Sequence, residues 1–309
     1  IQIGIRDDKL TVIAPIEDTP AARKGLQAND IILKINNDST KGISIKEAAD
    51  KIRGPKGTSV NLLIKREDEE INFIIVRDKI DIKSVSIKNP KYTKIDNNLG
   101  YIRLNSFLSH SASREMQEAL DKLKDKDGYI IDLRSNPGGL LTNAIFISDM
   151  FLNSGFIVST VDRDGYKETQ HASRHIITTK PLVVLIDGGS ASASEILSGA
   201  LKDNGRAVLI GTKSFGKGLV QEINRLPNNA GINITTQKYL TPNGTDINKL
   251  GIIPDIKVKN TKEDIKNKKD KQLEKAQKTL KDLLISEIKK ENKIKIINSE
   301  LPLRIIIQN

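Results

Sequence analysis

The sequence predicts a small β-rich module followed by an α/β domain with a parallel sheet and a helical C-terminal segment. In residues 1–80, short strand patterns are separated by turn residues. From 81 to 258, buried-strand patterns alternate with helix patterns, which is typical of βαβ units. Residues 259–309 begin with a lysine-rich stretch that carries a thin apolar stripe. A chain of 309 residues is long enough for two domains and a substantial core.

The first module is expected to contain two helices. A short helix should begin at Pro20, since Thr19 is a good cap and proline fits the first helical turn. A second, amphipathic helix is predicted for residues 44–52. Asn29 lies in a turn that needs a left-handed residue, a conformation that asparagine tolerates. Strands are predicted at 10–14, 31–35, 60–65 and 71–76.

The α/β region brings two turns of small residues to strand ends. In parallel sheets, sites form at the carboxyl ends of the strands. One such end is 136–139 (NPGG), and the other is 190–192 (SAS). Helices are predicted at 109–124, at 141–152 and after residue 192, and a longer one at about 259–292. The strands are expected at 100–104, 128–133, 181–187 and 207–210.

The segment 188–195 (GGSASASE) predicts a nucleophilic serine on a strand-to-helix turn, where backbone N–H groups stabilise an oxyanion. Chemistry alone does not choose among Ser190, Ser192 and Ser194. The base candidate is Lys217, which two glycines flank, and Lys213 is the weaker alternative. A lysine has an ordinary pKa of about 10.4, and burial lowers it.

Apolar neighbours of Lys217, namely Phe215, Leu219 and Val220, predict that it is buried. Taken alone, each motif also has a structural explanation. Lys217 could be a surface lysine beside a glycine turn, and NPGG an ordinary strand-to-helix connection. Glu195 is expected to cap the helix or interact with its dipole.

Composition excludes several classes of function. The chain has no cysteine, which excludes disulfides, thiolate nucleophiles and cysteine-bound metals. Three scattered histidines do not predict a metal site, so neither a metal nor another cofactor is expected. The net charge is +11, but no arginine clusters or interleaved aromatics accompany it, so a solvated lysine-rich helix is favoured over nucleic-acid binding.

No run reaches about 18 apolar residues, and no signal-peptide pattern follows Ile1, so any signal or anchor is expected to lie outside this chain.

The segments 19–21 (TPA), 25–26 (GL), 29–32 (NDII) and 52–58 (IRGPKGT) resemble a PDZ domain of the circularly arranged form found in bacterial proteases. The resemblance implies that a peptide adds as a strand beside Ile3, Gly4 and Ile5. Most of the glycine-rich loop that binds a terminal carboxylate is missing before this segment. Arg53 is implied as a sensor that contacts the protease body, with a solvated arginine as the alternative.

Longer motifs resemble the C-terminal processing peptidases, also called tail-specific proteases: 132–139 (DLRSNPGG), 190–196 (SASASEI), 203–207 (DNGRA), 211–221 (GTKSFGKGLVQ) and 239–244 (YLTPNG). The resemblance covers roughly residues 1–258. It implies Ser192 as nucleophile, Lys217 as general base and Gln221, one helical turn later, as the residue that orients the lysine. The oxyanion hole would use the N–H of Ala193 and that of Gly138 or Gly139.

This resemblance further implies a catalytic core similar to the crotonase/ClpP-like fold. It implies a PDZ-gated serine endopeptidase, exported to the bacterial periplasm or cell envelope, whose substrates are proteins or peptides with apolar C-termini. A homodimer, a docking role for 301–307 and a membrane anchor outside this chain stay open. The alternatives are a non-catalytic PDZ adaptor, a crotonase-type acyl-CoA enzyme and a nucleic-acid binder.

Overall fold

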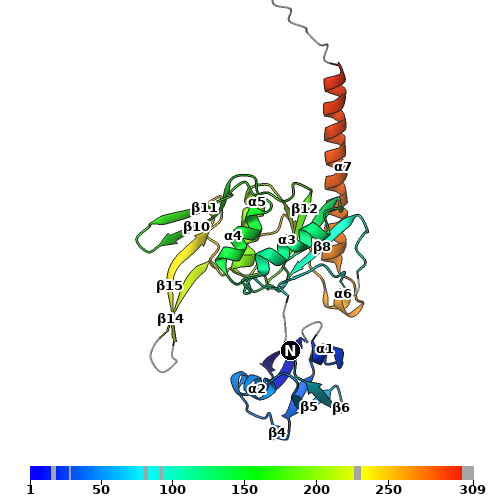
Figure 1. The fold of residues 1–309 in the computed structure, drawn as a ribbon, viewed down its shortest axis with the longest axis vertical. Helices are drawn as coiled ribbons and strands as arrows, with labels where there is room; N and C mark the ends of the chain where they lie inside the picture. The colour runs from blue at the N-terminus through cyan, green and yellow to red at the C-terminus, as the bar shows by residue number, and fades with distance from the viewer. Residues whose placement is uncertain (15–18, 28, 80–82, 91–92, 226–230, 301–309) are drawn as a thin grey trace, which may run out of the picture. The chain divides into compact units, whose positions relative to one another are not determined.

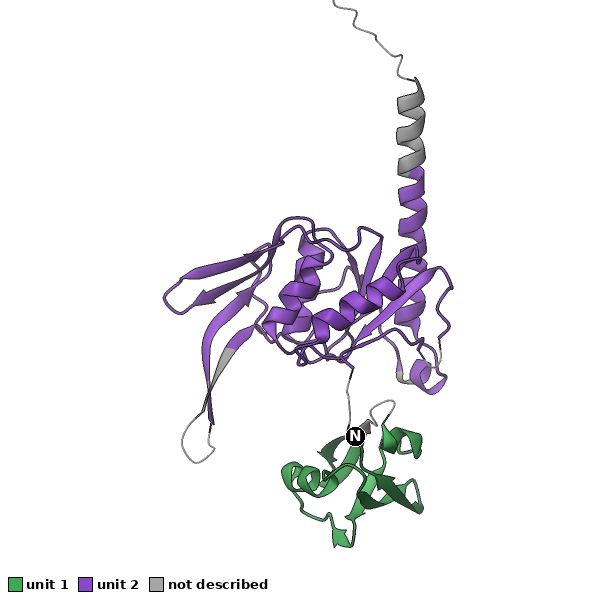
Figure 2. Cartoon of the chain, viewed as in Figure 1, with its two compact units in different colours: residues 1–82 green, residues 83–309 purple. Residues whose placement is uncertain are grey.

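A computed structural model describes residues 1–14, 19–27, 29–79, 83–90, 93–225 and 231–300 (Figure 1). The chain divides into two compact units, residues 1–82 and 83–309 (Figure 2). Each unit has its own apolar core, and each is described by itself below.

Unit 1 is an antiparallel sheet with two helices. The strands follow the path β1-β2-β3-β5-β6, with β4 paired to β3. Alternate residues of β5, namely Val60, Leu62 and Ile64, are buried in the core, as the period of two in a strand requires. The strands are β1 (Gln2–Arg6), β2 (Lys9–Ala14), β3 (Ile31–Ile35), β4 (Asp38–Ser39), β5 (Ser59–Arg66) and β6 (Glu69–Val76).

Both helices of unit 1 begin where the sequence predicts. Thr19 caps α1 (Pro20–Arg23) by accepting the Ala22 N–H at 3.4 Å. Ser44 and Glu47 form a capping box at the start of α2 (Ile45–Ile52). Asn29 adopts a φ of +72°, which confirms the left-handed turn expected there.

The main sheet of unit 2 has the order β16-β13-β12-β9-β8-β7. Its central strands are parallel, and only β7 pairs antiparallel to its neighbour. These strands are β7 (Val85–Ser86), β8 (Leu99–Leu104), β9 (Gly128–Asp132), β12 (Leu182–Ile186), β13 (Val208–Gly211) and β16 (Ile256–Lys257).

Helices cover both faces of this sheet. Ile131 and Val184 face the core that contains side chains of α3 (Ala112–Lys122), α4 (Leu141–Asp149) and α5 (Ala193–Asp203). Ile130 and Val183, their neighbours in the chain, face a second core that contains residues of α7. Burial on both faces explains why these strands are continuous apolar runs in the sequence.

A second, antiparallel sheet was not predicted. It has the order β11-β10-β15-β14, and Figure 1 shows it extending away from α4 and α5. Its strands are β10 (Phe156–Asp162), β11 (Lys167–His171), β14 (Leu219–Arg225) and β15 (Gly231–Leu240).

The prediction of a single helix at about 259–292 is wrong, because two helices occupy that region. α6 (Lys262–Lys266) ends at Asn267, and Lys268 takes a φ of +56° before α7 (Lys271–Glu300) begins. Leu273, Ala276 and Leu280 of α7 are fully buried against the sheet, so the beginning of this helix is part of the compact unit. The predicted docking segment at 301–307 lies outside the described residues. No helix in the described part of the chain is long and apolar enough to cross a membrane.

Candidate active site

Ser192 lies on the turn that joins β12 to α5. Its φ of +54° and ψ of −115° are unusual for a residue with a side chain, and such strain persists only where the surroundings hold it. Here the Ser192 N–H donates to Glu195 Oε2 at 2.8 Å, and its carbonyl accepts the N–H groups of Glu195 and Ile196. The serine is therefore held at the beginning of the helix by its own backbone.

The two neighbouring serines have structural roles. Ser190 and Ser194 are fully buried. The Ser190 hydroxyl donates to the carbonyl of Leu133 at 2.8 Å, and the Ser194 hydroxyl donates to that of Asn136 at 2.9 Å. Ser192 is only half-buried, and its hydroxyl donates to no group in the described residues. Of the three serines, Ser192 is thus the one available to react.

The turn at 136–139 packs directly against Ser192. A Cβ atom built on Gly138 would lie 2.9 Å from both Ala193 N and Ser192 Cβ, so only glycine fits at this approach. The Gly138 N–H donates to Asn136 Oδ1 at 2.9 Å. The N–H groups of Gly139 and Ala193 have no acceptor among the described residues. This geometry favours Gly139 over Gly138 as a donor to an oxyanion.

Glu195 joins the serine turn to the loop that carries Lys217. Its carboxylate is fully buried. Oε2 accepts the N–H groups of Ser192 and Lys217, both at 2.8 Å. Oε1 accepts the Gly216 N–H at 2.7 Å and the Ser214 hydroxyl at 2.5 Å. One carboxylate therefore brings the backbones of the candidate nucleophile and the candidate base together.

The side chain of Lys217 is exposed, contrary to the expectation that apolar neighbours bury it. Phe215 is itself 65% exposed, whereas Leu219 and Val220 are partly buried. The physical reason is that the N–H groups of Gly216 and Lys217 face inward and donate to Glu195. This backbone orientation leaves the Lys217 side chain in solvent. Lys213 is exposed as well, so exposure does not distinguish the two lysines, but only Lys217 is bound to Glu195.

Gln221 is not one helical turn after Lys217. It lies on β14, where its backbone pairs with Thr235 and the register shifts between Val220 and Gln221. Gly218 begins this strand geometry: its carbonyl accepts the Tyr239 N–H at 2.8 Å, and a Cβ on it would lie 2.2 Å from Asn248 N. The pairing of this backbone with β15 gives the segment strand geometry in place of a helical turn. The side chain of Gln221 lies outside what the structure describes.

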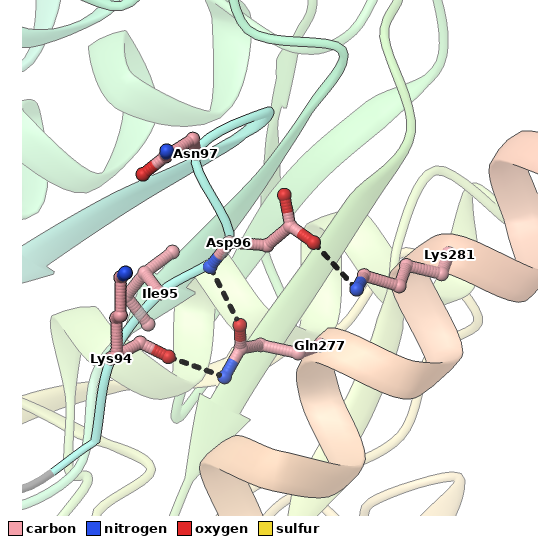
Figure 3. A pocket seen from close by; sticks show the side chains of 6 residues that line it. All are labelled: Lys94, Ile95, Asp96, Asn97, Gln277 and Lys281. Atoms are coloured by element: carbon pink, nitrogen blue, oxygen red, sulfur yellow. Dashed lines mark hydrogen bonds and ion pairs between the residues drawn. The ribbon is translucent and has the colours of Figure 1, made fainter.

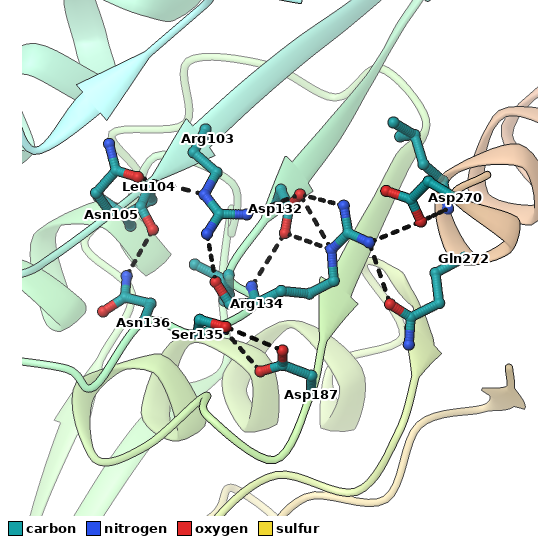
Figure 4. Close-up of polar contacts among 12 residues, drawn as sticks. Arg103, Leu104, Asn105, Asp132, Arg134, Ser135, Asn136, Asp187, Asp270 and Gln272 are labelled. Carbon is teal, nitrogen blue, oxygen red and sulfur yellow. Dashed lines mark hydrogen bonds and ion pairs between the residues drawn. The ribbon is translucent and has the colours of Figure 1, made fainter. Parts of the chain in front are cut away.

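A buried ionic cluster supports the turn from the other side (Figure 4). Asp132, at the end of β9, is fully buried and accepts the Tyr101 hydroxyl at 2.8 Å. Burial alone would raise the pKa of Asp132, but the guanidinium groups of Arg134 and Arg103 outweigh it and hold that pKa below its ordinary value. Burial also raises the pKa of Tyr101. Sequence reasoning placed Asp132 and Arg134 only inside a motif and assigned them no role.

In unit 1, the predicted peptide-binding segment forms an edge strand. β1 pairs only with β2 among the described strands, so its other edge is free to pair. Ile3 packs partly on the core, Gly4 is half-buried, and Ile5 is 43% exposed. Arg53 follows α2 with an exposed side chain.

Comparison with protein families gives two matches. Residues 98–258 match the model of peptidase family S41, and residues 11–66 match a PDZ domain. These two regions contain the candidate active site and most of the strands of unit 1.

Individual relatives agree with the family matches. The chain is 43% identical over 268 residues to a carboxy-terminal-processing protease of Bartonella bacilliformis, covering 84% of this chain and 60% of the relative. It is 44% identical over 263 residues to a carboxyl-terminal-processing protease of Picosynechococcus, covering 82% and 62%. The chain thus spans about three fifths of the length of these relatives. A solved structure, the photosystem II D1 C-terminal processing protease, is 29% identical with a TM-score of 0.58, covering 84% of this chain and 71% of that one.

Proposed function

Because the chain belongs to peptidase family S41, we propose that it is a serine endopeptidase with a Ser192–Lys217 dyad and a PDZ domain that recognises protein C-termini. The observation that carries the proposal is the shared acceptor: the N–H groups of Ser192 and Lys217 bind the same oxygen of Glu195. This arrangement brings together two chain segments that the sequence separates. A serine beside a lysine is a known pairing of nucleophile and base.

The proposed reaction begins when Ser192 Oγ attacks the scissile carbonyl and its proton passes to Lys217 Nζ. The N–H groups of Ala193 and Gly139 would bind the oxyanion, since the Gly138 N–H already donates to Asn136. The intermediate collapses when the C–N bond breaks and the leaving amine takes the proton from Lys217. Water then attacks the acyl-enzyme and gives a proton to Lys217. The ester C–O bond breaks, and Lys217 returns the proton to Ser192 Oγ.

The exposure of Lys217 adds a condition to this mechanism. A lysine accepts a proton only as the neutral amine, which removal from water favours. We infer that a substrate lying across Ser192 covers the lysine and its exposed neighbour Phe215. Catalytic contacts that are loose in the free enzyme often tighten in the substrate complex. Gln221 is proposed to orient the lysine in that state.

Recognition is proposed to use the free edge of β1. The C-terminal residues of a substrate would pair with Ile3, Gly4 and Ile5 as an added strand, and apolar side chains would suit this partly apolar edge. Arg53 is proposed to respond to the bound peptide. An exported location in the periplasm or cell envelope, a homodimer, a membrane anchor outside this chain and a crotonase/ClpP-like core also stand as proposals. The names of the carboxy-terminal-processing relatives support the substrate class.

The test is hydrolysis of an unfolded protein with an apolar C-terminus by the whole chain. We expect Ser192→Ala and Lys217→Ala each to lower the rate by about a thousandfold or more, because nucleophile and base act as a unit. Lys213→Ala is the matched control, since Lys213 is equally exposed but is not bound to Glu195, and it should keep full activity.

Three outcomes would contradict this assignment. Cleavage that survives in Ser192→Ala would show a different nucleophile. Loss in Lys213→Ala but not in Lys217→Ala would exchange the two lysines. A parent chain that binds C-terminal peptides without cleaving any protein would support the adaptor alternative.

A further inference from the structure

The first turn of α7 is bound to the active-site turn through Arg134. Arg134 Nη1 donates to Asp270 Oδ1 at 2.8 Å and to Gln272 Oε1 at 3.1 Å. Asp270 precedes α7, and its Oδ1 also accepts the Leu273 N–H at 3.1 Å. Figure 4 shows Arg134 lying between this acceptor pair and the buried Asp132. The guanidinium of Arg134 therefore joins Asp132, at the end of the central strand β9, to the start of a helix that is distant in the chain.

The guanidinium is held on both sides, so its position is fixed. Nε and Nη2 of Arg134 bind the Asp132 carboxylate at 2.6–3.1 Å. The side chain is only 12% exposed, and such charge-assisted, forked hydrogen bonds are strong and directional. The Arg134 carbonyl in turn accepts Arg103 Nη2 at 2.7 Å. Removing Asp270 would leave one arm of the fork without its carboxylate.

Arg134 is the first residue of the turn that reaches Gly139. The next residue, Ser135, has a φ of +56° and donates its N–H to Asp187 at 2.7 Å. Asn136 then binds both sides of the site: its carbonyl accepts the Ala191 N–H at 3.0 Å, and its Oδ1 accepts the Gly138 N–H. A shift of Arg134 would pass through these contacts to the glycines.

We propose that Asp270 is a positioning residue for the active site: it fixes Arg134 and, through it, the turn 135–139 that supplies an oxyanion donor. The proposal rests on the proposed function of Ser192 and adds α7 to the structural support of the site. The S41 match ends at residue 258, so the match assigns nothing to this helix. On this proposal, the beginning of α7 supports the catalytic unit.

The test is Asp270→Asn in the whole chain. Asparagine is as good a helix N-cap as aspartate, so the variant keeps the capping and removes the charge that faces Arg134. We expect kcat on the unfolded protein substrate to fall about tenfold to a hundredfold with KM unchanged, because small displacements of catalytic groups cost rates of that order.

Lys281→Ala is the matched control on the same helix. Lys281 pairs with Asp96 at 2.5 Å, beside Gln277, which accepts the Asp96 N–H at 2.9 Å (Figure 3). This variant also removes an ionic contact of α7 but leaves Arg134 untouched. We expect the two variants to have similar melting temperatures, and Lys281→Ala to keep the parent kcat. If kcat in both variants follows only the melting temperature, the role of Asp270 is structural and the proposal is overturned.

A second readout needs no activity, which separates failure of this proposal from failure of the proposed function. Amide hydrogen exchange in residues 134–140 should become several times faster in Asp270→Asn than in the parent and in Lys281→Ala. Unchanged exchange there would overturn the positioning role even if the parent chain hydrolysed nothing. Where the parent is active, Arg134→Lys combined with Asp270→Asn should be no slower than Arg134→Lys alone, since both act through one contact. If the losses of kcat in the two single variants multiply in the double variant, the two residues do not act through one contact.

Discussion

At the scale of single residues, Glu195 accepts more hydrogen bonds than the sequence indicated. Its position three residues after Ser192 predicted a helix cap, and the Ser192 N–H does bind it. The same carboxylate also accepts hydrogen bonds from Ser214, Gly216 and Lys217. The spacing of 25 residues between Ser192 and Lys217 therefore becomes a short distance in space through one acidic side chain.

Glu195→Gln should impair both stability and catalysis. A glutamine offers one carbonyl oxygen and an NH2 group, so two of the four donors would lose their acceptor, at about 1–3 kcal/mol each. We expect hydrolysis to fall about a hundredfold, since the Lys217 loop would shift from Ser192. The measurements are steady-state hydrolysis and urea unfolding.

Glu115→Gln is a control of the same chemistry. Glu115 accepts the Val85 N–H at 3.1 Å and the Ser111 hydroxyl at 2.6 Å, at the start of α3. The Glu115→Gln protein should be less stable than the parent but should keep the parental activity. A Glu195→Gln protein with parental activity would show that the shared carboxylate is not needed for the site.

At the scale of elements, α7 differs along its length. Leu273, Ala276 and Leu280 are fully buried on the sheet, whereas Ile285 and Ile288 are 52% and 56% exposed. Gly128 of β9 makes room for this packing, because a Cβ there would lie 2.9 Å from Leu280. The beginning of α7 therefore behaves as a core helix.

Leu280→Ala should lower the free energy of unfolding of unit 2 by about 2–5 kcal/mol, the usual cost of a cavity in a core. Ile285→Ala, on the same helix, should change it by about 0.5 kcal/mol or less, as exposed substitutions do. Urea unfolding followed by circular dichroism measures both. Equal effects would mean that α7 is not docked on the sheet in solution.

At the scale of the whole molecule, the two units have separate cores. The cluster built on Leu62, Ile32 and Val12 draws all its members from residues 1–75, and the other two clusters draw theirs from residues 85–284. A unit of this size can bury enough surface to fold alone. The fold therefore predicts two separable unfolding events.

Residues 1–82 expressed alone should unfold cooperatively, at the temperature of one of two transitions that calorimetry resolves in the whole chain. Leu62→Ala should lower that transition and leave the other unchanged, since Leu62 is fully buried in the first core only. A single transition that Leu62→Ala shifts as a whole would contradict independent units.

The sequence by itself determined what short-range patterns encode. Apolar runs indicated the parallel strands. The cap at Thr19 indicated the start of α1, and an amphipathic pattern indicated α2. The motif around Ser192 gave the candidate nucleophile, although chemistry alone left three serines open. These signals are local, because a strand or a helix start depends on neighbouring residues.

Tertiary structure decided what depends on partners far along the chain. β10 pairs with β15 about eighty residues away, and Lys167–His171 has no apolar pattern to reveal β11. The exposure of Lys217, the strand at Gln221 and the contact from Asp270 to Arg134 were equally hidden. Hydrogen bonds and burial at these positions depend on which distant segments pack together in the folded chain. A local sequence pattern does not contain that information.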